Sequence, residues 1–268
     1  MENRKSIALK RFYCSNKGKR LAKSHSVWLK KFYKTEKGKR LRKEISKRNR
    51  KYNVNEKFFE RLNPVSAYVL GFWVADGHIS HDLIRFDQKE KGILEKIKEA
   101  MGATYPLYRN GSAYRLQINS KKIQKSLNQL MSFPLSQKKN RAKYPDIPKE
   151  LDSHFIRGVF DGDGCIYIAK NTQLGISFSS ETKPFLKQIQ QKLVDQFGIN
   201  KTKIIRVESE SGVCWELRYN GNKQVPPIFD WLYKGADLYL ERKKAKYRGW
   251  NGLKQRQKVN TLYLLPFH

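Results

Sequence analysis

The sequence of 268 residues has few cysteines and no long apolar run. Its three cysteines, Cys14, Cys165 and Cys214, are scattered and form no CxxC pair, which argues against a zinc knuckle or a disulfide framework. No segment approaches the roughly 20 apolar residues of a membrane-spanning helix. The first residues also lack the apolar centre of a signal peptide. We therefore expect a reducing intracellular location, either cytoplasmic (bacterial or phage) or organellar, and no membrane partner.

Acidic residues are scarce beside basic ones. The chain has 24 Asp and Glu against 56 Lys and Arg, which gives a formal net charge of +32. A basic excess of this size is typical of proteins that bind a polyanion, and nucleic acid is the obvious candidate. Half of the excess lies in the first 60 residues, which hold 21 Lys and Arg and 5 Asp and Glu.

This basic N-terminal segment contains an internal repeat, in which Lys10–Ser26 aligns with Lys30–Ser46. Both copies contain Phe-Tyr followed by K-G-K-R-L, and Gly18 and Gly38 are expected to mark turns. Units this short bury little alone, so one interpretation is a disordered basic tail. The other is a DNA-binding extension over residues 1–62 that follows the DNA backbone. Its predicted contacts are Lys17, Lys19, Arg20, Lys37, Lys39 and Arg40.

Two later stretches are alike: Ala67–Gly77 reads AYVLGFWVADG, and His154–Gly164 reads HFIRGVFDGDG. Each has an apolar helical pattern, then a glycine, and four residues later a small residue, an Asp and a Gly. The duplication predicts two similar half-domains that pack about a pseudo-two-fold axis. Two carboxylates brought together at such an axis, Asp76 and Asp163, form a site for a hard metal cation.

The order of elements also repeats. Residues 63–149 and 150–250 are each predicted to fold as αββαββα, with residues 251–268 as a C-terminal tail whose apolar end docks on the body. Asn63-Pro64 has the residue types of a helix start, with Asn as N-cap and Pro in the first turn. Asn110-Gly111 predicts a tight hairpin turn between two strands.

Small residues lie on one face of each motif helix, because positions four apart share a face. Gly71 and Ala75 form one such pair, and Gly158 and Gly162 form the other. Small side chains let two helix backbones approach closely. The carboxylates at the helix ends are therefore expected to meet.

The motifs resemble those of the LAGLIDADG homing endonucleases, in the form with two motifs in one chain. The resemblance covers residues 64–250 and implies an α/β (α+β) fold of two pseudo-symmetric halves, whose antiparallel sheets form a saddle over the DNA major groove. It implies a monomer that cuts double-stranded DNA at a long asymmetric target in intron homing. In the family, divalent metals bind the two carboxylates and the carbonyl before each. The corresponding residues here are Asp76, Asp163, Ala75 and Gly162.

The resemblance also implies Mg²⁺ or Mn²⁺ as cofactor, with Ca²⁺ bound but not supporting cleavage. It places a lysine near the cleavage site in each half, at Lys138 and Lys243, with the neighbours Lys139 and Lys244 as alternatives. A solvated basic face is another interpretation of these lysines. Gln88 matches a water-positioning glutamine. Its counterpart in the second half is Ser180 or Glu181, so the halves are expected to differ chemically.

Base contacts are expected from polar residues that alternate with apolar ones along the strands, since alternation places each set on one face. Arg, Gln, Asn and Glu pair with base edges in the major groove, although a half-exposed sheet gives the same pattern. The predicted residues are Arg85, Arg115, Gln117, Asn119, Arg206, Glu208, Glu216, Arg218 and Asn220.

Two other functions fit the same fold: an RNA-binding intron maturase, for which intron RNA would be the partner, and a non-catalytic DNA-binding regulator. Loss of one or both motif acids would favour these alternatives, and both acids are present. Val74 stands where the motif has its first acid, whereas Asp161 keeps it; in the family this position does not bind the metal. The sequence therefore favours a metal-dependent DNA endonuclease.

Overall fold

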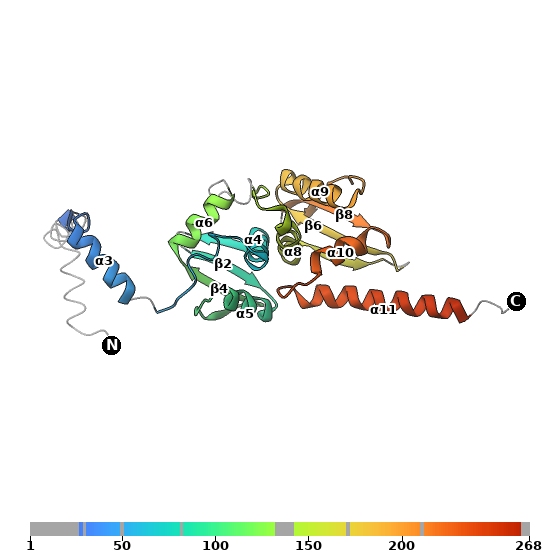
Figure 1. Ribbon diagram of the computed structural model, residues 1–268, viewed down its shortest axis with the longest axis horizontal. Helices are drawn as coiled ribbons and strands as arrows, with labels where there is room; N and C mark the ends of the chain where they lie inside the picture. Colours follow the sequence, from blue (N-terminus) through green and yellow to red (C-terminus); the bar gives the residue numbers. More distant parts are fainter. Residues whose placement is uncertain are drawn as a thin grey trace. The chain divides into compact units, whose positions relative to one another are not determined.

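The computed structural model describes residues 27–28, 31–48, 51–80, 83–131, 142–169, 172–209 and 212–263 (Figure 1). The chain divides into a unit of residues 1–52 and a unit of residues 53–268. The division comes earlier than the boundary after residue 62 that the sequence predicted. Residues 53–62 belong to the larger unit because the Asn53 N–H donates to Thr104 Oγ1 at 2.8 Å, and Phe59 is buried.

The larger unit contains the two predicted αββαββα halves, each with a four-stranded antiparallel sheet, ordered β1-β2-β4-β3 and β5-β6-β8-β7. The first half consists of α4 (Pro64–Asp76), β1 (Gly77–Ser80), β2 (Leu83–Gln88), α5 (Lys91–Ala100), β3 (Leu107–Asn110), β4 (Ala113–Asn119) and α6 (Lys121–Met131). The second half consists of the 3-10 helix η2 (Lys149–Leu151), α8 (Asp152–Asp163), β5 (Cys165–Ile168), β6 (Leu174–Ser180), α9 (Lys183–Phe197), β7 (Ile205–Ser209), β8 (Gly212–Asn220), α10 (Val225–Tyr233) and α11 (Glu241–Tyr263).

Helix α4 begins as the sequence predicted. The Asn63 side chain accepts hydrogen bonds from the N–H groups of Val65 and Ser66 at 3.0 and 2.9 Å, and the Asn63 N–H donates to Ser66 Oγ at 2.8 Å. This capping box satisfies N–H groups that a helix start otherwise leaves unpaired.

The predicted Asn110-Gly111 turn also forms, with Gly111 at φ +59° between β3 and β4.

Helices α4 and α8 lie side by side at the centre of the larger unit, with one sheet on either side (Figure 1). Their backbones are in direct contact at two glycines. A Cβ added to Gly71 would lie 2.0 Å from the Phe155 carbonyl oxygen, and a Cβ added to Gly158 would lie 2.1 Å from the Tyr68 carbonyl oxygen. No other amino acid fits at such a distance, so the predicted small-residue contact is confirmed.

The smaller unit contains α3 (Glu36–Arg48). Thr35 caps this helix, because its Oγ1 accepts from the Gly38 N–H at 3.1 Å and donates to the Phe32 carbonyl at 2.7 Å. The turn expected at Gly38 is wrong: Gly38 lies inside the helix, and a Cβ there would be 2.0 Å from the Phe32 oxygen. Its role is to let the helix backbone lie close to the Phe32 carbonyl. The first repeat copy, with Gly18, lies outside the described residues.

Helix α11 is longer than the sequence predicted. The expected helix end near residue 248 and the separate tail from residue 251 are both wrong, since α11 continues to Tyr263. Gly249 and Gly252 do not interrupt it. The apolar end that was expected to dock lies mostly beyond the described residues. Within the described part of the chain, no helix is both long and apolar enough to cross a membrane.

The glycine contact between α4 and α8 gives a test of the fold. We predict that Gly158→Ala lowers the free energy of unfolding by about 1–3 kcal/mol, because a methyl group there overlaps the backbone of α4. Gly249→Ala is the matched control, since a Cβ at Gly249 meets nothing within 4 Å and alanine favours a helix interior by about 0.5–1 kcal/mol. Urea denaturation of both variants measures the difference, and equal stabilities would contradict the packing.

Candidate active site

The two acids of the repeated motif lie at the C-terminal ends of α4 and α8, where Asp76 and Asp163 are the last helical residues. The helix ends are in contact. A Cβ added to Gly162 would lie 2.4 Å from the Ala75 Cβ and 3.6 Å from Asp76 Cγ. The small residues before each acid therefore bring the carboxylates together, as the sequence predicted.

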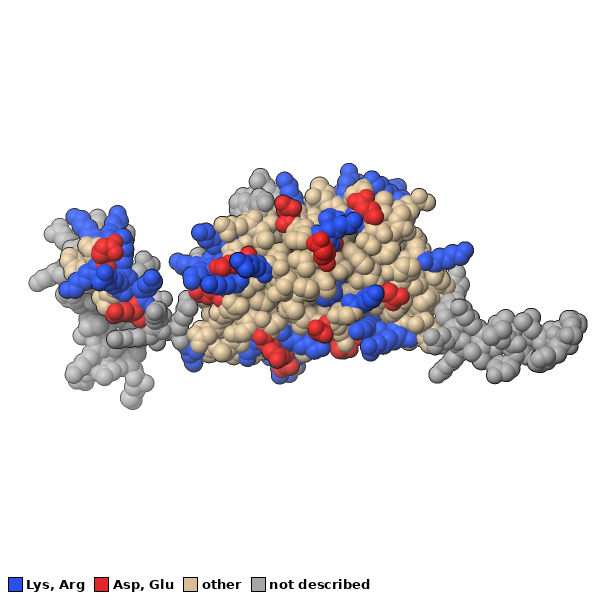
Figure 2. All heavy atoms as spheres, in the orientation of Figure 1, with Lys and Arg blue, Asp and Glu red and all other residues tan. Residues whose placement is uncertain are grey.

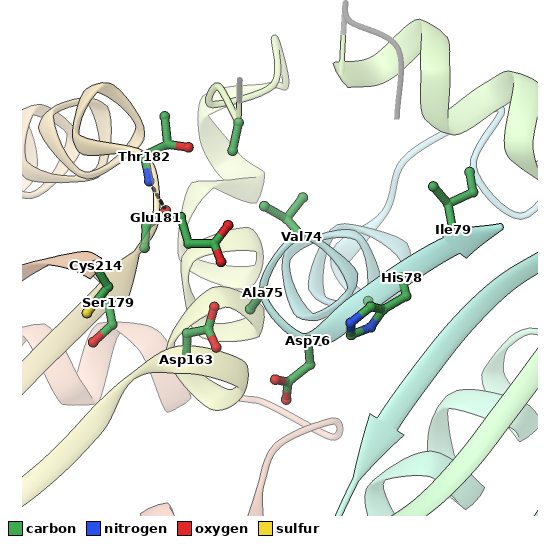
Figure 3. Close-up of a pocket in the computed structure, with 13 residues that line it drawn as sticks. Val74, Ala75, Asp76, His78, Ile79, Asp163, Ser179, Glu181, Thr182 and Cys214 are labelled. Carbon is green, nitrogen blue, oxygen red and sulfur yellow. Dashed lines mark hydrogen bonds between the residues drawn. The ribbon is translucent and has the colours of Figure 1, made fainter. Parts of the chain in front are cut away.

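Both carboxylates line one cavity of about 550 Å³. Figure 3 shows them on neighbouring helix ends, facing the same space, with His78 of β1 on one side and Glu181 on the other. Asp76 is half-buried and Asp163 is exposed. The cavity is open enough for a substrate group to reach both acids.

The donor atoms at this cavity fit a hard divalent cation. Asp76, Asp163 and Ala75 line the cavity and offer two carboxylates and one backbone carbonyl, all oxygen ligands, whereas Gly162, the other residue expected to supply a carbonyl, is not among the lining residues. Among the residues that the structure describes, no three His, Cys, Asp or Glu side chains form a metal cluster. Mg²⁺ does not need one, because it commonly binds one or two carboxylates and completes its shell with water and substrate phosphate oxygens. The site therefore fits a metal that is held jointly by protein and substrate.

Gln88 lies beside the first acid, and its Nε2 donates to Asp76 Oδ2 at 3.0 Å. Strand register identifies its counterpart in the second half. Gln88 pairs with Tyr114, and Ser180 pairs with Trp215 at the equivalent position. Of the two counterparts that the sequence left open, the register selects Ser180. Asp76 thus has an amide partner, whereas the matched position of the second half carries the short hydroxyl of Ser180.

Lys243 is buried, with 1% of its surface exposed. Its ammonium donates to the carbonyls of Phe160, of Asp161 at 2.9 Å and of Gly164 at 2.6 Å. Burial lowers the pKa of Lys243 to about 8, although the Asp161 carboxylate opposes the shift. The structure thus gives Lys243 a role that the sequence did not indicate, which is to hold the end of α8. Its catalytic role stays a prediction, and Lys138 and Lys139 lie outside the described residues.

Asp161, two residues before Asp163, is fully buried, and its carboxylate joins the two halves. It accepts hydrogen bonds from Tyr68 Oη of α4 at 3.0 Å, from Tyr233 Oη, and from the Leu240 N–H at 2.9 Å. Burial raises the pKa of Asp161, although the hydrogen bond from Tyr233 opposes the shift. The first half has no equivalent, because Val74 occupies this position.

Each sheet has one apolar face on the core and one polar face. In the first half, Leu116 and Ile118 are buried, and Arg115, Gln117 and Asn119 lie on the opposite face. Arg85 shares this face, since it pairs with Gln117 across β2 and β4. In the second half, Glu216, Arg218 and Asn220 alternate with the buried Leu217 and Tyr219. For these seven residues the predicted division into faces is confirmed.

Comparison with known proteins identifies the family. Residues 63–131 and 150–226 each match the LAGLIDADG-like domain. The chain belongs to the LAGLIDADG family. An intron-encoded DNA endonuclease of Dictyostelium discoideum, ai2b, is 29% identical over 185 residues, which cover 62% of this chain and 68% of that protein.

Two solved structures also have similarity to this chain. One is the I-LtrWI LAGLIDADG homing endonuclease bound to target DNA, which is 12% identical over 73% of this chain and 91% of its own, with a TM-score of 0.48. The other is the LAGLIDADG homing endonuclease I-GzeII in complex with its DNA target, 16% identical over 76% of this chain and 94% of its own, with a TM-score of 0.47.

Two residues that were predicted to contact bases, Arg206 and Glu208, lie on the opposite face of the second-half sheet from Glu216. Arg206 pairs with Trp215 and Glu208 pairs with Val213, whereas Ile205 pairs with Glu216. Cross-strand partners share a face, so Arg206 and Glu208 point away from the polar face that carries Glu216. The face expected for these two residues is wrong, because alternation alone does not tell which set of β7 shares a face with Glu216, and an offset of one residue exchanges the faces of a strand. Their contact with DNA stays a prediction. They form an ion pair with each other.

The polar faces also contain residues that the sequence analysis missed. Tyr108, which is 46% exposed, and Asp87 both pair with Arg115. In the second half, Ser177 and Ser179 pair with Arg218 and Glu216. Alternation along β2 and β6 could have identified Asp87 and the two serines. The position of Tyr108 required the pairing of β3 with β4.

Three of the predicted contacts in the basic repeat are described: Lys37, Lys39 and Arg40 are exposed on α3. Lys39 forms an ion pair with Glu36 at 2.7 Å. Figure 2 shows Lys and Arg side chains gathered over this helix. The other three, Lys17, Lys19 and Arg20, lie outside the described residues.

The hydrogen bonds of Lys243 give a prediction for stability. Lys243→Met removes the donor of three carbonyls at the end of α8, and we expect the free energy of unfolding to fall by about 1–3 kcal/mol. Lys244→Met is the control. The Lys244 ammonium lies 3.9 Å from the centre of the Tyr239 ring, and removal of this cation–π interaction should cost less than about 1 kcal/mol. A Lys243→Met variant as stable as the wild type in chemical denaturation would refute the structural role.

Proposed function

We propose that this protein is a site-specific double-strand DNA endonuclease that hydrolyses phosphodiester bonds with divalent metal. The observation that carries the proposal is the pair of acids, Asp76 and Asp163, on two helix ends that line one cavity between two sheets with polar outer faces. The net charge of +32 favours a polyanionic substrate. The name of the Dictyostelium relative, an intron-encoded DNA endonuclease, supports the same activity.

In this proposal, Asp76 and Asp163 hold Mg²⁺ or Mn²⁺ with the carbonyls of Ala75 and Gly162. When bound, the metal makes water a better nucleophile and stabilises the leaving oxygen and the charge on phosphorus. The residues of the chain position these groups. Gln88 orients the Asp76 carboxylate by donating its amide N–H to Oδ2. Lys243 and Asp161 hold the end of α8 and so fix the position of Asp163.

The target should be long and asymmetric. Each half presents a separate polar sheet face, and the two faces carry different residues at matched positions, such as Gln117 in one and Arg218 in the other. A single chain with two such faces would read two different half-sites, over roughly two turns of DNA. A monomer is therefore sufficient. The nuclease is favoured over an RNA-binding maturase or a regulator because both acids are kept.

The first prediction for this function concerns the acids. Purified protein incubated with a random DNA library and Mg²⁺ should release discrete cut products, which sequencing of the ends identifies. Asp76→Asn and Asp163→Asn should each bind the selected site and lose double-strand cleavage, because each removes a metal ligand. Chelation with EDTA should have the same effect.

The control for these variants is Asp195→Asn on α9, an exposed acid that accepts a hydrogen bond from Gln191 and does not line the cavity. It should cut like the wild type. Double-strand cleavage at the wild-type rate by either motif variant would show that the acids are not the metal ligands.

The second prediction concerns the basic unit. Deletion of residues 1–52 removes the repeat and leaves the buried Phe59 in place. If this unit neutralises DNA phosphates, the slope of log K against log salt should become shallower by about 0.9 for each phosphate that the truncated protein no longer neutralises. The DNA footprint should shorten, and cleavage should persist at higher protein concentration. Full-length and truncated protein with the same salt slope would show that the unit does not bind DNA.

A further inference from the structure

One carboxylate on the polar face of the first half holds two arginines from different strands. Asp87 lies on β2, and its Oδ1 accepts from Arg115 Nε of β4 at 2.6 Å. Its Oδ2 lies 2.8 Å from Arg85 Nε. The three side chains are between 21% and 29% exposed, so the cluster is partly screened from water but accessible from the polar face.

The contacts leave the outer ends of both arginines available. Asp87 engages the Nε atom of each guanidinium, and the terminal nitrogens form no ion pair with another described residue. An arginine reads guanine with its terminal nitrogens, which donate to O6 and N7 together. The hydrogen bond from Arg115 Nε to Asp87 fixes the plane of that guanidinium, whereas Arg85 Nε is held by the ion pair alone and makes no hydrogen bond. Both contacts reduce the side-chain entropy that is lost when an arginine binds a base.

The cluster adjoins the catalytic cavity. The next residue along β2, Gln88, donates to Asp76, and His78, which lines the cavity, has its Nδ1 3.9 Å from Asp87 Oδ2. The base pairs that these arginines can reach therefore lie next to the scissile bonds, on the side of the first half.

The second half has different chemistry at the same positions. By register, Ser177 corresponds to Arg85, Ser179 to Asp87 and Glu216 to Arg115. The remaining arginine on that face, Arg218, donates a terminal nitrogen to Glu216. This hydrogen bond occupies the end of the guanidinium that would read a guanine. The two halves thus differ in charge at matched positions.

We propose that Asp87 orients Arg85 and Arg115 as a paired guanine reader, so that the DNA target has guanines at two positions beside the cut on the side of the first half. The equivalent positions on the other side lack this requirement. Asp87 is a positioning residue in this account, since it contacts the arginines and not the bases. The inference rests on the proposed function, because it needs DNA on the polar faces.

The test is a selection of bound DNA from a random library, with the full-length protein in Ca²⁺, which in the proposed function allows binding without cleavage. Sequencing gives the base preference at each position. Wild-type protein should enrich guanine at two positions in one half-site. Arg85→Ala and Arg115→Ala should each lower the preference at one of them by about 5- to 150-fold, the discrimination of a bidentate arginine–guanine pair.

Asp87→Asn keeps the size of the side chain and removes its charge. It should weaken the guanine preference at both positions and leave the other positions unchanged, an effect that a general loss of stability would not produce. Ser179→Ala, at the matched position of the second half, is the control and should leave both guanine positions unchanged. Thermal melting of each variant confirms that the folded protein is compared.

The outcomes separate this inference from the proposed function. Enrichment of a specific site without guanine at these positions would overturn the guanine reader and leave the endonuclease intact. The same holds if Asp87→Asn weakens binding to all sequences equally, or leaves the preference unchanged. Failure to enrich any DNA sequence would contradict the proposed function and this inference together.

Discussion

The close backbone contact between α4 and α8 is the constraint on which the rest of the structure depends. Gly71 and Gly158 allow each helix to touch a carbonyl of the other, and this distance sets where the helix ends meet. The acids follow the glycines by five residues on each helix, so they arrive at one cavity from both halves. The contact that joins the halves is thus also the contact that assembles the candidate active site.

The two halves have the same order of helices and strands on either side of this contact, but the residues at matched positions differ chemically. Asp161 ties the second helix to Tyr68, Tyr233 and the segment before α11, whereas Val74 at the matched position packs into the apolar core. Gln88 is matched by Ser180. Lys243 and Asp161 hold the end of α8 next to Asp163, and Gln88 contacts the Asp76 side chain directly, so the two halves support their motif acids with different residues.

Most of this fold could be predicted from local sequence signals. The remaining features depend on strand register and on contacts between distant segments of the chain. The capping residues at Asn63-Pro64, the Asn110-Gly111 turn and the glycines of the motif each specify a conformation within a few residues, and all three were predicted correctly. The faces of β7 depend on which residue of β8 stands opposite, so Arg206 and Glu208 were misplaced. The burial of Lys243 depends on contacts with Phe160, Asp161 and Gly164, which lie 79 to 83 residues earlier in the sequence, and no periodicity within α11 reveals it.

The central claim is that the ends of α4 and α8 jointly hold a metal. The most direct measurement is a crystal structure of the protein with a selected DNA target and Mn²⁺, in which anomalous scattering locates the ion. The account predicts an anomalous peak at about 2.0–2.3 Å from carboxylate oxygens of Asp76 and Asp163, with a DNA phosphate oxygen completing the site. A peak bound by other residues, or DNA bound with its phosphates remote from both acids, would contradict it.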